Sequence, residues 1–129
     1  MNAWHAREHT GLKVERDGAV AVITLSHPPA NTWTVHSLAA LRDLVGELDA
    51  DRDIYALVIV GEGEKFFSAG ADLKQFAGGD KAGAREAARR FGEAFEALSA
   101  FRGVSIAAIN GYAMGGGLEC ALACDLRIA

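Results

Sequence analysis

The chain has 129 residues, half of them hydrophobic, and its formal net charge at pH 7 is −4. This composition predicts a single soluble domain with a packed core. The acidic balance argues against a nucleic-acid-binding surface, and no apolar run reaches the length of a membrane span. Polar and charged residues interrupt the N-terminal segment, so no signal-peptide core is expected there. We therefore expect a cytoplasmic protein without nucleic-acid or membrane partners.

The first expected element is a β-hairpin. Residues 12–16 and 19–26 suit strands, and Asp17-Gly18 between them is a strong hairpin signal. The two prolines of residues 27–31 should end the second strand, because proline lacks a backbone N–H and fixes its own backbone angle.

A helix and two strands are expected next. Thr34 is a suitable N-cap, and apolar residues recur after it at helical spacing. They are Leu38, Leu41, Leu44, Val45 and Leu48. Residues 56–60 are too short and too β-branched for a helix and lack polar alternation, which predicts a strand buried on both faces. Residues 66–68 favour a further short strand.

A long helix is expected after Asp80, with an apolar stripe opposite its charged residues. The stripe consists of Ala84, Ala87, Ala88, Phe91, Phe95, Leu98 and Phe101. We interpret it as core. Residues 104–109 should return as a strand, followed by a helix at 116–124 and the start of another strand at 126–129. Alternating strands and helices with short loops predict the α/β class.

The cysteines and histidines show no metal-ligand spacing, so no metal is expected. Cys120 and Cys124 stand four residues apart on the helix expected at 116–124. We interpret them as small buried side chains rather than as a disulfide or redox pair. The four histidines form no HExxH-like pattern.

The run Gly115-Gly116-Gly117, between an expected strand and helix, is the most informative stretch. The first turn of a helix leaves N–H groups without intrahelical partners, and glycine lets a ligand approach them. Glu119 follows Gly116 by about one turn, so a donor for a negative oxygen and a base can share one cavity. Alternatively, the glycines only allow tight packing and Glu119 only stabilises the helix start. Neither a P-loop nor a dinucleotide fingerprint is present.

A second glycine bend lies upstream, within residues 65–74. Gly70 can turn the backbone so that the Ala71 N–H points into a cavity. Ser68 lacks a Gly-x-Ser-x-Gly elbow, which disfavours a nucleophilic role. We interpret Asp72 as bracing the loop or capping the next turn.

Together the two stretches resemble the crotonase, or enoyl-CoA hydratase/isomerase, superfamily. Residues 67–74 (FSAGADLK) look like its first oxyanion loop and residues 110–119 (NGYAMGGGLE) like its second. The resemblance implies a spiral of ββα units that is incomplete at the C-terminus. Residues 1–129 are then the N-terminal part of a catalytic domain, and a second catalytic glutamate falls beyond Ala129. The full-length protein is expected to form a homotrimer or a dimer of trimers.

The resemblance also implies roles for individual residues. The N–H groups of Ala71 and Gly116 are expected to bind the thioester oxygen of an acyl-CoA substrate, and Glu119 to act as acid/base group toward water. No separate cofactor is expected, because coenzyme A is part of the substrate. Further expected substrate contacts are Ala30, Lys65, Ala69, Gly70, Asp72, Leu73, Lys74, Tyr112 and Gly115.

Several alternatives stay open for single residues. Ala30 equally suits a rigid turn, and Lys65 and Lys74 equally suit solvated surface positions. Phe91 and Phe95 can line an acyl tunnel instead of the core. Trp33 and Tyr112 either shape the acyl pocket or simply pack.

Three functions compete at this point. Hydration of a 2-enoyl-CoA is preferred because Glu119 is present. Isomerisation, decarboxylation or thioester hydrolysis on the same oxyanion hole would use the same visible residues. A non-catalytic, truncated CoA-binding fragment is the third.

Overall fold

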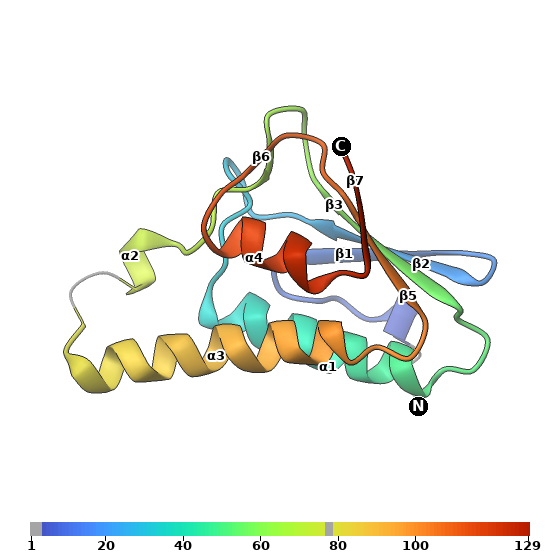
Figure 1. Ribbon diagram of the computed structural model, residues 1–129, viewed down its shortest axis with the longest axis horizontal. Coiled ribbons are helices and arrows are strands. Elements are labelled where there is room, and N and C mark those ends of the chain that lie inside the picture. Colours follow the sequence, from blue (N-terminus) through green and yellow to red (C-terminus); the bar gives the residue numbers. More distant parts are fainter. Residues whose placement is uncertain (1–3, 77–78) are drawn as a thin grey trace.

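The computed structural model describes residues 4–76 and 79–129, which form two sheets and their covering helices (Figure 1). The larger sheet has the order β1-β2-β3-β5-β7, with bounds Leu12–Asp17, Val20–Leu25, Ala56–Gly61, Val104–Ala108 and Leu126–Ile128. The smaller sheet pairs β4 (Phe66–Ser68) with β6 (Tyr112–Ala113). The helical segments are η1 (Trp4–Ala6), α1 (Val35–Ala50), α2 (Leu73–Phe76), α3 (Lys81–Ser99) and α4 (Gly116–Ala123). None of the described helices combines the length and hydropathy of a membrane span.

β1 and β2 form the predicted hairpin. The strands are antiparallel, with Asp17 opposite Val20, and Gly18 in the turn has a φ of +60°. Glycine adopts such a φ without steric cost, which explains its place in the turn. The other strand pairs of this sheet are parallel, so helices connect them. The α/β class is confirmed.

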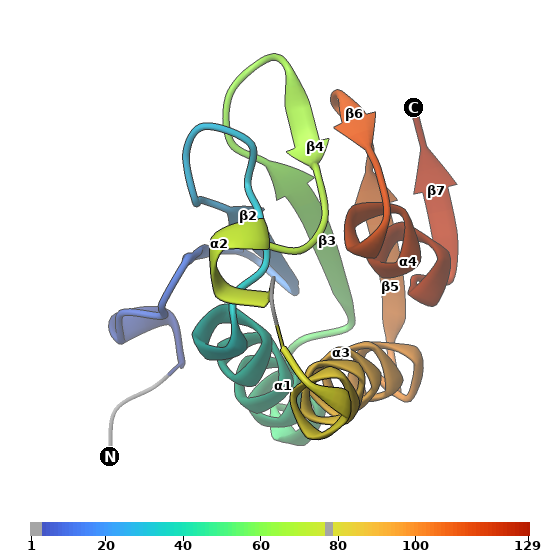
Figure 2. The ribbon, with the colours of Figure 1, turned by 90° about the vertical axis from the view of Figure 1, so that its left-hand side faces the viewer.

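The segments β3-β4-α3 and β5-β6-α4 are two structural repeats with the same arrangement. Each contributes its first strand to the larger sheet, its second strand to the smaller sheet, and then a helix. Equivalent strands of the two repeats are parallel neighbours, β3 beside β5 and β4 beside β6 (Figure 2). This arrangement is the spiral of ββα units that the resemblance implied.

α1 and α3 lie side by side against the larger sheet (Figures 1 and 2). Thr34 caps α1 as predicted, because its side-chain oxygen accepts the Ser37 N–H at 3.0 Å. The Ser37 side chain accepts the Thr34 N–H in return, at 2.9 Å. All five predicted core residues of α1 are buried, so this helix follows its sequence pattern closely: Leu38, Leu41, Leu44, Val45 and Leu48.

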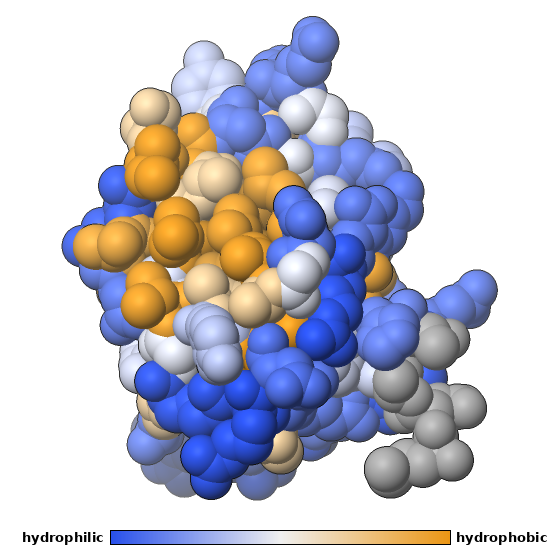
Figure 3. Space-filling view, turned by 90° about the vertical axis from the view of Figure 1, so that its right-hand side faces the viewer, coloured by the Kyte–Doolittle hydropathy of each residue, from blue (hydrophilic) through white to orange (hydrophobic). Residues whose placement is uncertain are grey.

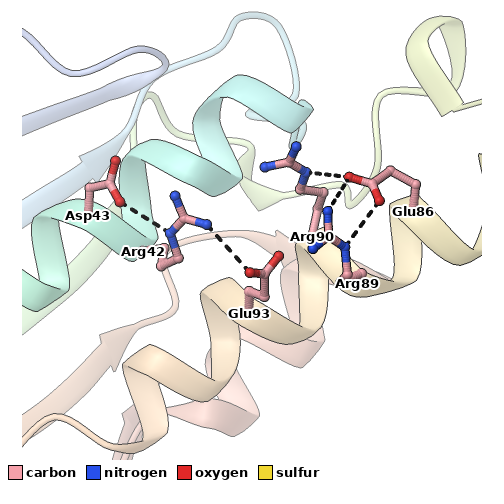
Figure 4. Close-up of polar contacts among 6 residues, drawn as sticks. All are labelled: Arg42, Asp43, Glu86, Arg89, Arg90 and Glu93. Atoms are coloured by element: carbon pink, nitrogen blue, oxygen red, sulfur yellow. Dashed lines mark hydrogen bonds and ion pairs between the residues drawn. The ribbon is translucent and has the colours of Figure 1, made fainter.

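Charged side chains lie on the solvent side of the α1–α3 contact (Figure 4). Arg42 of α1 places its Nη1 atom 3.5 Å from Oε2 of Glu93 on α3. Farther along α3, Glu86 accepts hydrogen bonds from Arg89 and Arg90 at 2.9 Å. The Arg89 bond is the largest cause of the lowered pKa of Glu86. Exposed ion pairs contribute little stability, so the apolar faces hold the two helices together.

Two burial expectations need correction. On β3, Leu57 and Ile59 are fully buried in the same core as α1 and α3, but Val58 and Val60 on the other face are only half-buried. On α3, the predicted core stripe is buried only toward the C-terminal end, and Ala84 is exposed. The N-terminal half of α3 extends beyond the sheet and so has less to pack against (Figure 1).

Candidate active site

The first loop of the site follows β4. Its backbone leaves the N–H of Ala71 without a backbone hydrogen-bond partner among the described residues. Trp33 donates its N–H to the Gly70 carbonyl at 2.7 Å and accepts the Asp72 N–H at 2.9 Å. In such a parallel bridge the N–H of the intervening residue points away from the partner strand. Gly70 has a φ of +101°, which favours glycine. Within the described residues, the Ala71 N–H donates no backbone hydrogen bond.

The second loop leads into α4 and leaves the amide of Gly116 unused. Gly115 precedes the helix with a φ of +51°, and Gly116 is the first helical residue. The first intrahelical bonds are donated by Gly117 to Met114, at 2.8 Å, and by Glu119 to Gly115, at 2.9 Å. Within the described residues the Gly116 N–H donates no backbone hydrogen bond outside the helix, and it lies at the positive end of the helix dipole.

The two loops touch each other at their glycines. A Cβ atom on Gly70 would lie 2.9 Å from the Met114 carbonyl oxygen and 3.2 Å from the Gly116 amide nitrogen. A Cβ on Gly117 would collide with the Ser68 carbonyl, and Met114 donates its N–H to that same carbonyl at 3.0 Å. Close backbone contact thus requires glycine here and brings the two amide-bearing loops together.

Ala71, Gly116 and Glu119 line one pocket of about 440 Å³. Glu119 is solvent-exposed, on the first turn of α4. The opposite wall comes from α3 and consists of Ala88, Phe91, Gly92 and Phe95. The structure therefore brings together two amides and a carboxylate from loops far apart in the sequence, beside an apolar wall.

A second pocket, of about 510 Å³, meets the first at Ala71 and Gly116. Lys74 and Asp72 are its charged lining residues. The remaining lining residues are Pro29, Ala30, Thr32, Ala69, Gly70, Leu73 and Gly115. Most of the expected substrate contacts thus gather around this pocket. Pro29 and Thr32 were not foreseen, although they flank Ala30 in the sequence.

Asp72 and Ser68 make contacts that favour structural roles. The Asp72 carboxylate accepts the Lys74 N–H at 3.0 Å, at the start of α2, and lies 3.5 Å from the His27 ring. The Ser68 hydroxyl is buried and accepts the Gly70 N–H at 3.2 Å. Across the part of the chain that the structure describes, no three His, Cys, Asp or Glu side chains gather to hold a metal ion.

Lys65 and Tyr112 line neither of the two pockets. Both lie beside Phe66 on the smaller sheet: the Lys65 Nζ atom is 5.5 Å from the Phe66 ring centre, and the Tyr112 ring is 5.9 Å from it. Trp33 is buried and packs edge-on against Phe95, with ring centres 5.6 Å apart. For Trp33 the packing alternative is therefore the better description.

Asn31 is a residue of the site region that the sequence reasoning missed. Its φ is +53°, and its buried side-chain amide donates to the carbonyls of Glu62, Phe66 and Phe67 at 3.0 to 3.3 Å. Asparagine tolerates this backbone region better than most residues. It ties the segment before Trp33 to the strand that leads into the first loop. The Pro-Pro-Ala-Asn turn was the only available signal.

Comparisons with known proteins identify the family of the chain. The family model for enoyl-CoA hydratase/isomerase matches residues 15–129. The short-chain-enoyl-CoA hydratase of Clostridium acetobutylicum is 36% identical over 95% of this chain and 47% of its own. Pseudomonas aeruginosa DspI, a solved structure, has a TM-score of 0.90 at 72% identity, over 92% of this chain and 49% of that one.

A crystal structure of an enoyl-CoA hydratase from Bacillus anthracis also matches, with a TM-score of 0.89 at 35% identity over 92% of this chain and 47% of that one. The chain spans about half the length of these relatives. Family model, relatives and fold all point the same way. This chain belongs to the enoyl-CoA hydratase/isomerase family.

Proposed function

We propose that this chain carries the thioester-binding part of an enoyl-CoA hydratase, a lyase that adds water across the double bond of a 2-enoyl-CoA. The observation that carries the proposal is the single pocket shared by Ala71, Gly116 and Glu119. Family membership supports it, because several relatives are named as hydratases. Coenzyme A enters as part of the substrate, so the reaction needs no separate cofactor.

The two amides supply the electrostatic part of the reaction. When the oxygen of water bonds to C3 of the enoyl group, the electron pair of the C2–C3 double bond moves toward the thioester oxygen. The N–H groups of Ala71 and Gly116 stabilise the enolate that forms. The water loses one proton as its oxygen bonds to C3, and addition of one proton at C2 balances that loss and completes the hydration. Each such donor contributes about 3 kcal/mol to transition-state stabilisation.

Glu119 is the acid/base group toward the attacking water. Its carboxylate lies on α4 one turn after Gly116, so the pocket that holds the thioester oxygen also receives this side chain. A general base needs to be within hydrogen-bond reach of the proton that it removes, directly or through one water. The place of Glu119 in the same pocket as the two amides supports this role.

The two adjoining pockets divide the substrate between them. The thioester belongs at their junction, which Ala71 and Gly116 form. The second pocket, with Lys74 at its edge, suits the anionic coenzyme A portion. The first pocket, walled by aromatic and small residues of α3, suits the acyl chain.

Replacing Glu119 tests the proposal. In the full-length gene product, Glu119→Gln should lower kcat for crotonyl-CoA hydration by about 10² to 10⁴, because the amide cannot accept the proton from water. Loss of enoyl-thioester absorbance measures the rate. Glu96→Gln is the matched control, since Glu96 is an exposed glutamate of α3 that does not line the pocket. Equal rates for the two variants would refute the role of Glu119.

A further inference from the structure

One face of α3 forms the wall of the acyl pocket. Ala88, Phe91, Gly92 and Phe95 recur at spacings of three and four residues, which places them on one side of the helix. They line the pocket together with Gly116 and Glu119 of α4. This face alternates two aromatic rings with two of the smallest residues.

The aromatic half of this wall is held in place by its neighbours. The Phe91 ring packs against Phe76 and Phe95, with ring centres 5.5 and 5.8 Å apart. Phe95 in turn packs against the buried Trp33. Phe91 also lies against Gly116, where an added Cβ would come within 2.7 Å of the ring. The aromatic side of the pocket is therefore close-packed and its position is fixed.

The other half of the wall is open at Gly92. A Cβ atom built on Gly92 meets no atom within 4 Å. Gly92 lies in the middle of α3 and is not among the glycines with positive φ. Neither a turn nor a close backbone contact explains a glycine here, and glycine is a poor helix former. Gly92 is exposed, so the space beside it is open both to solvent and to the pocket that Gly92 lines.

We propose that Gly92 is a specificity-determining residue that keeps the acyl pocket open for 2-enoyl groups longer or bulkier than crotonyl. This inference rests on the proposed function. A cavity of roughly 150 Å³ already accommodates a benzene ring. The pocket of about 440 Å³, which is open to solvent on one side, has room for more than the single methyl group that crotonyl places beyond its double bond.

Filling the space from Gly92 tests the assignment. The measured quantity is the ratio of kcat/KM for dodecenoyl-CoA to that for crotonyl-CoA, in the full-length gene product. Gly92→Leu should lower this ratio by about 10- to 100-fold, because one misplaced group in an apolar pocket changes discrimination by that order. Gly92→Ala should lower it by less. Both variants should fold, since glycine is replaced inside a helix where a Cβ has room.

The matched control is Gly46→Leu. Gly46 is an exposed glycine inside α1, an added Cβ there also meets nothing within 4 Å, and it does not line the pocket. Its substrate ratio should stay at the wild-type value. A Gly92→Leu ratio that equals that of Gly46→Leu would overturn the assignment.

Binding measurements separate this inference from the proposed function. Titration calorimetry with dodecanoyl-CoA and butyryl-CoA, which cannot be hydrated, reports the pocket without the reaction. Weaker binding of dodecanoyl-CoA alone in Gly92→Leu would support the assignment even if crotonyl-CoA hydration failed. Equal weakening of both thioesters, or of neither, would contradict it.

Discussion

A proline at position 116 would remove the backbone N–H donor and leave the neighbouring side chains unchanged. Proline is favoured at the first helical position, where its missing N–H is not needed by the helix. Gly116→Pro should lower kcat about 10²- to 10³-fold below Gly116→Ala, because only the proline variant lacks the donor. Both variants place a Cβ against the Phe91 ring, so Gly116→Ala controls for that contact. Steady-state hydration assays compare them, and equal rates would show that this N–H does not act on the oxyanion.

The predicted burial of the two cysteines is confirmed. Cys120 and Cys124 are both buried and free. Burial is the largest cause that raises the pKa of Cys124 from 9.0 to about 11, and it raises the pKa of Cys120 as well. The neutral thiol is thus favoured in the folded state. Its stabilising contribution is complete below pH 9.0 and is lost as the pH rises toward about 11.

The raised pKa makes a direct prediction about reactivity. At pH 8, iodoacetamide should modify neither cysteine in the folded chain at an appreciable rate, because the thiolate is the nucleophile. Both should react in urea, where burial is lost. Mass spectrometry after timed quenching counts the adducts. Modification of the folded chain at the rate seen in urea would show that the thiols are accessible and ionised.

At the scale of elements, Asn31 links the turn after β2 to the β3–β4 connection and to β4. Its side chain donates to the carbonyls of Glu62, Phe66 and Phe67, and only 3% of the residue is exposed. Asn31→Asp should lower the free energy of unfolding by about 3 kcal/mol, because a buried carboxylate would then face three carbonyl oxygens. Urea unfolding measures this value. A loss below about 0.5 kcal/mol would mean that other contacts hold the turn.

The sequence predicted an element best where an apolar helical pattern was long and the whole apolar face packed against other elements. The α1 pattern and its Thr34 cap were sufficient because α1 packs along its whole length. The α3 pattern was equally regular, yet three of its seven stripe residues, Ala88, Phe91 and Phe95, line the pocket. Periodicity identifies an apolar face but not what lies opposite. α2 and β6 were missed because elements of four and two residues carry no period.

At the scale of the molecule, the arrangement of the strands in two sheets could not be read from local patterns. β4 and β6 are too short to show alternation, and their pairing joins residues more than forty positions apart. The resemblance to a family supplied the ββα repeat but not the pairing of β4 with β6. The convergence of the two glycine loops was likewise a family-level expectation. The glycine contacts now give it a steric reason, because only glycine permits their backbones to approach so closely.

The molecule also presents a large apolar face, over α4 and β7 (Figure 3). Its exposed residues include Leu118, Leu122, Leu126 and Ile128, which are 45 to 62% exposed. β7 is an edge strand of the larger sheet, so unpaired backbone groups accompany these side chains. Contiguous apolar patches of this kind mark surfaces that another polypeptide covers. We define the apolar face by these four residues.

The 129-residue chain alone should therefore bind a hydrophobic dye and self-associate through the apolar face. Leu122→Glu should reduce both effects, because it places a charge in the face at a position that contributes little to the core. Leu73→Glu is the control, since Leu73 is 75% exposed on α2, outside the apolar face. Dye fluorescence and sedimentation velocity measure the outcome. A monomeric chain without dye binding, or equal effects of the two variants, would show that the apolar face does not drive association.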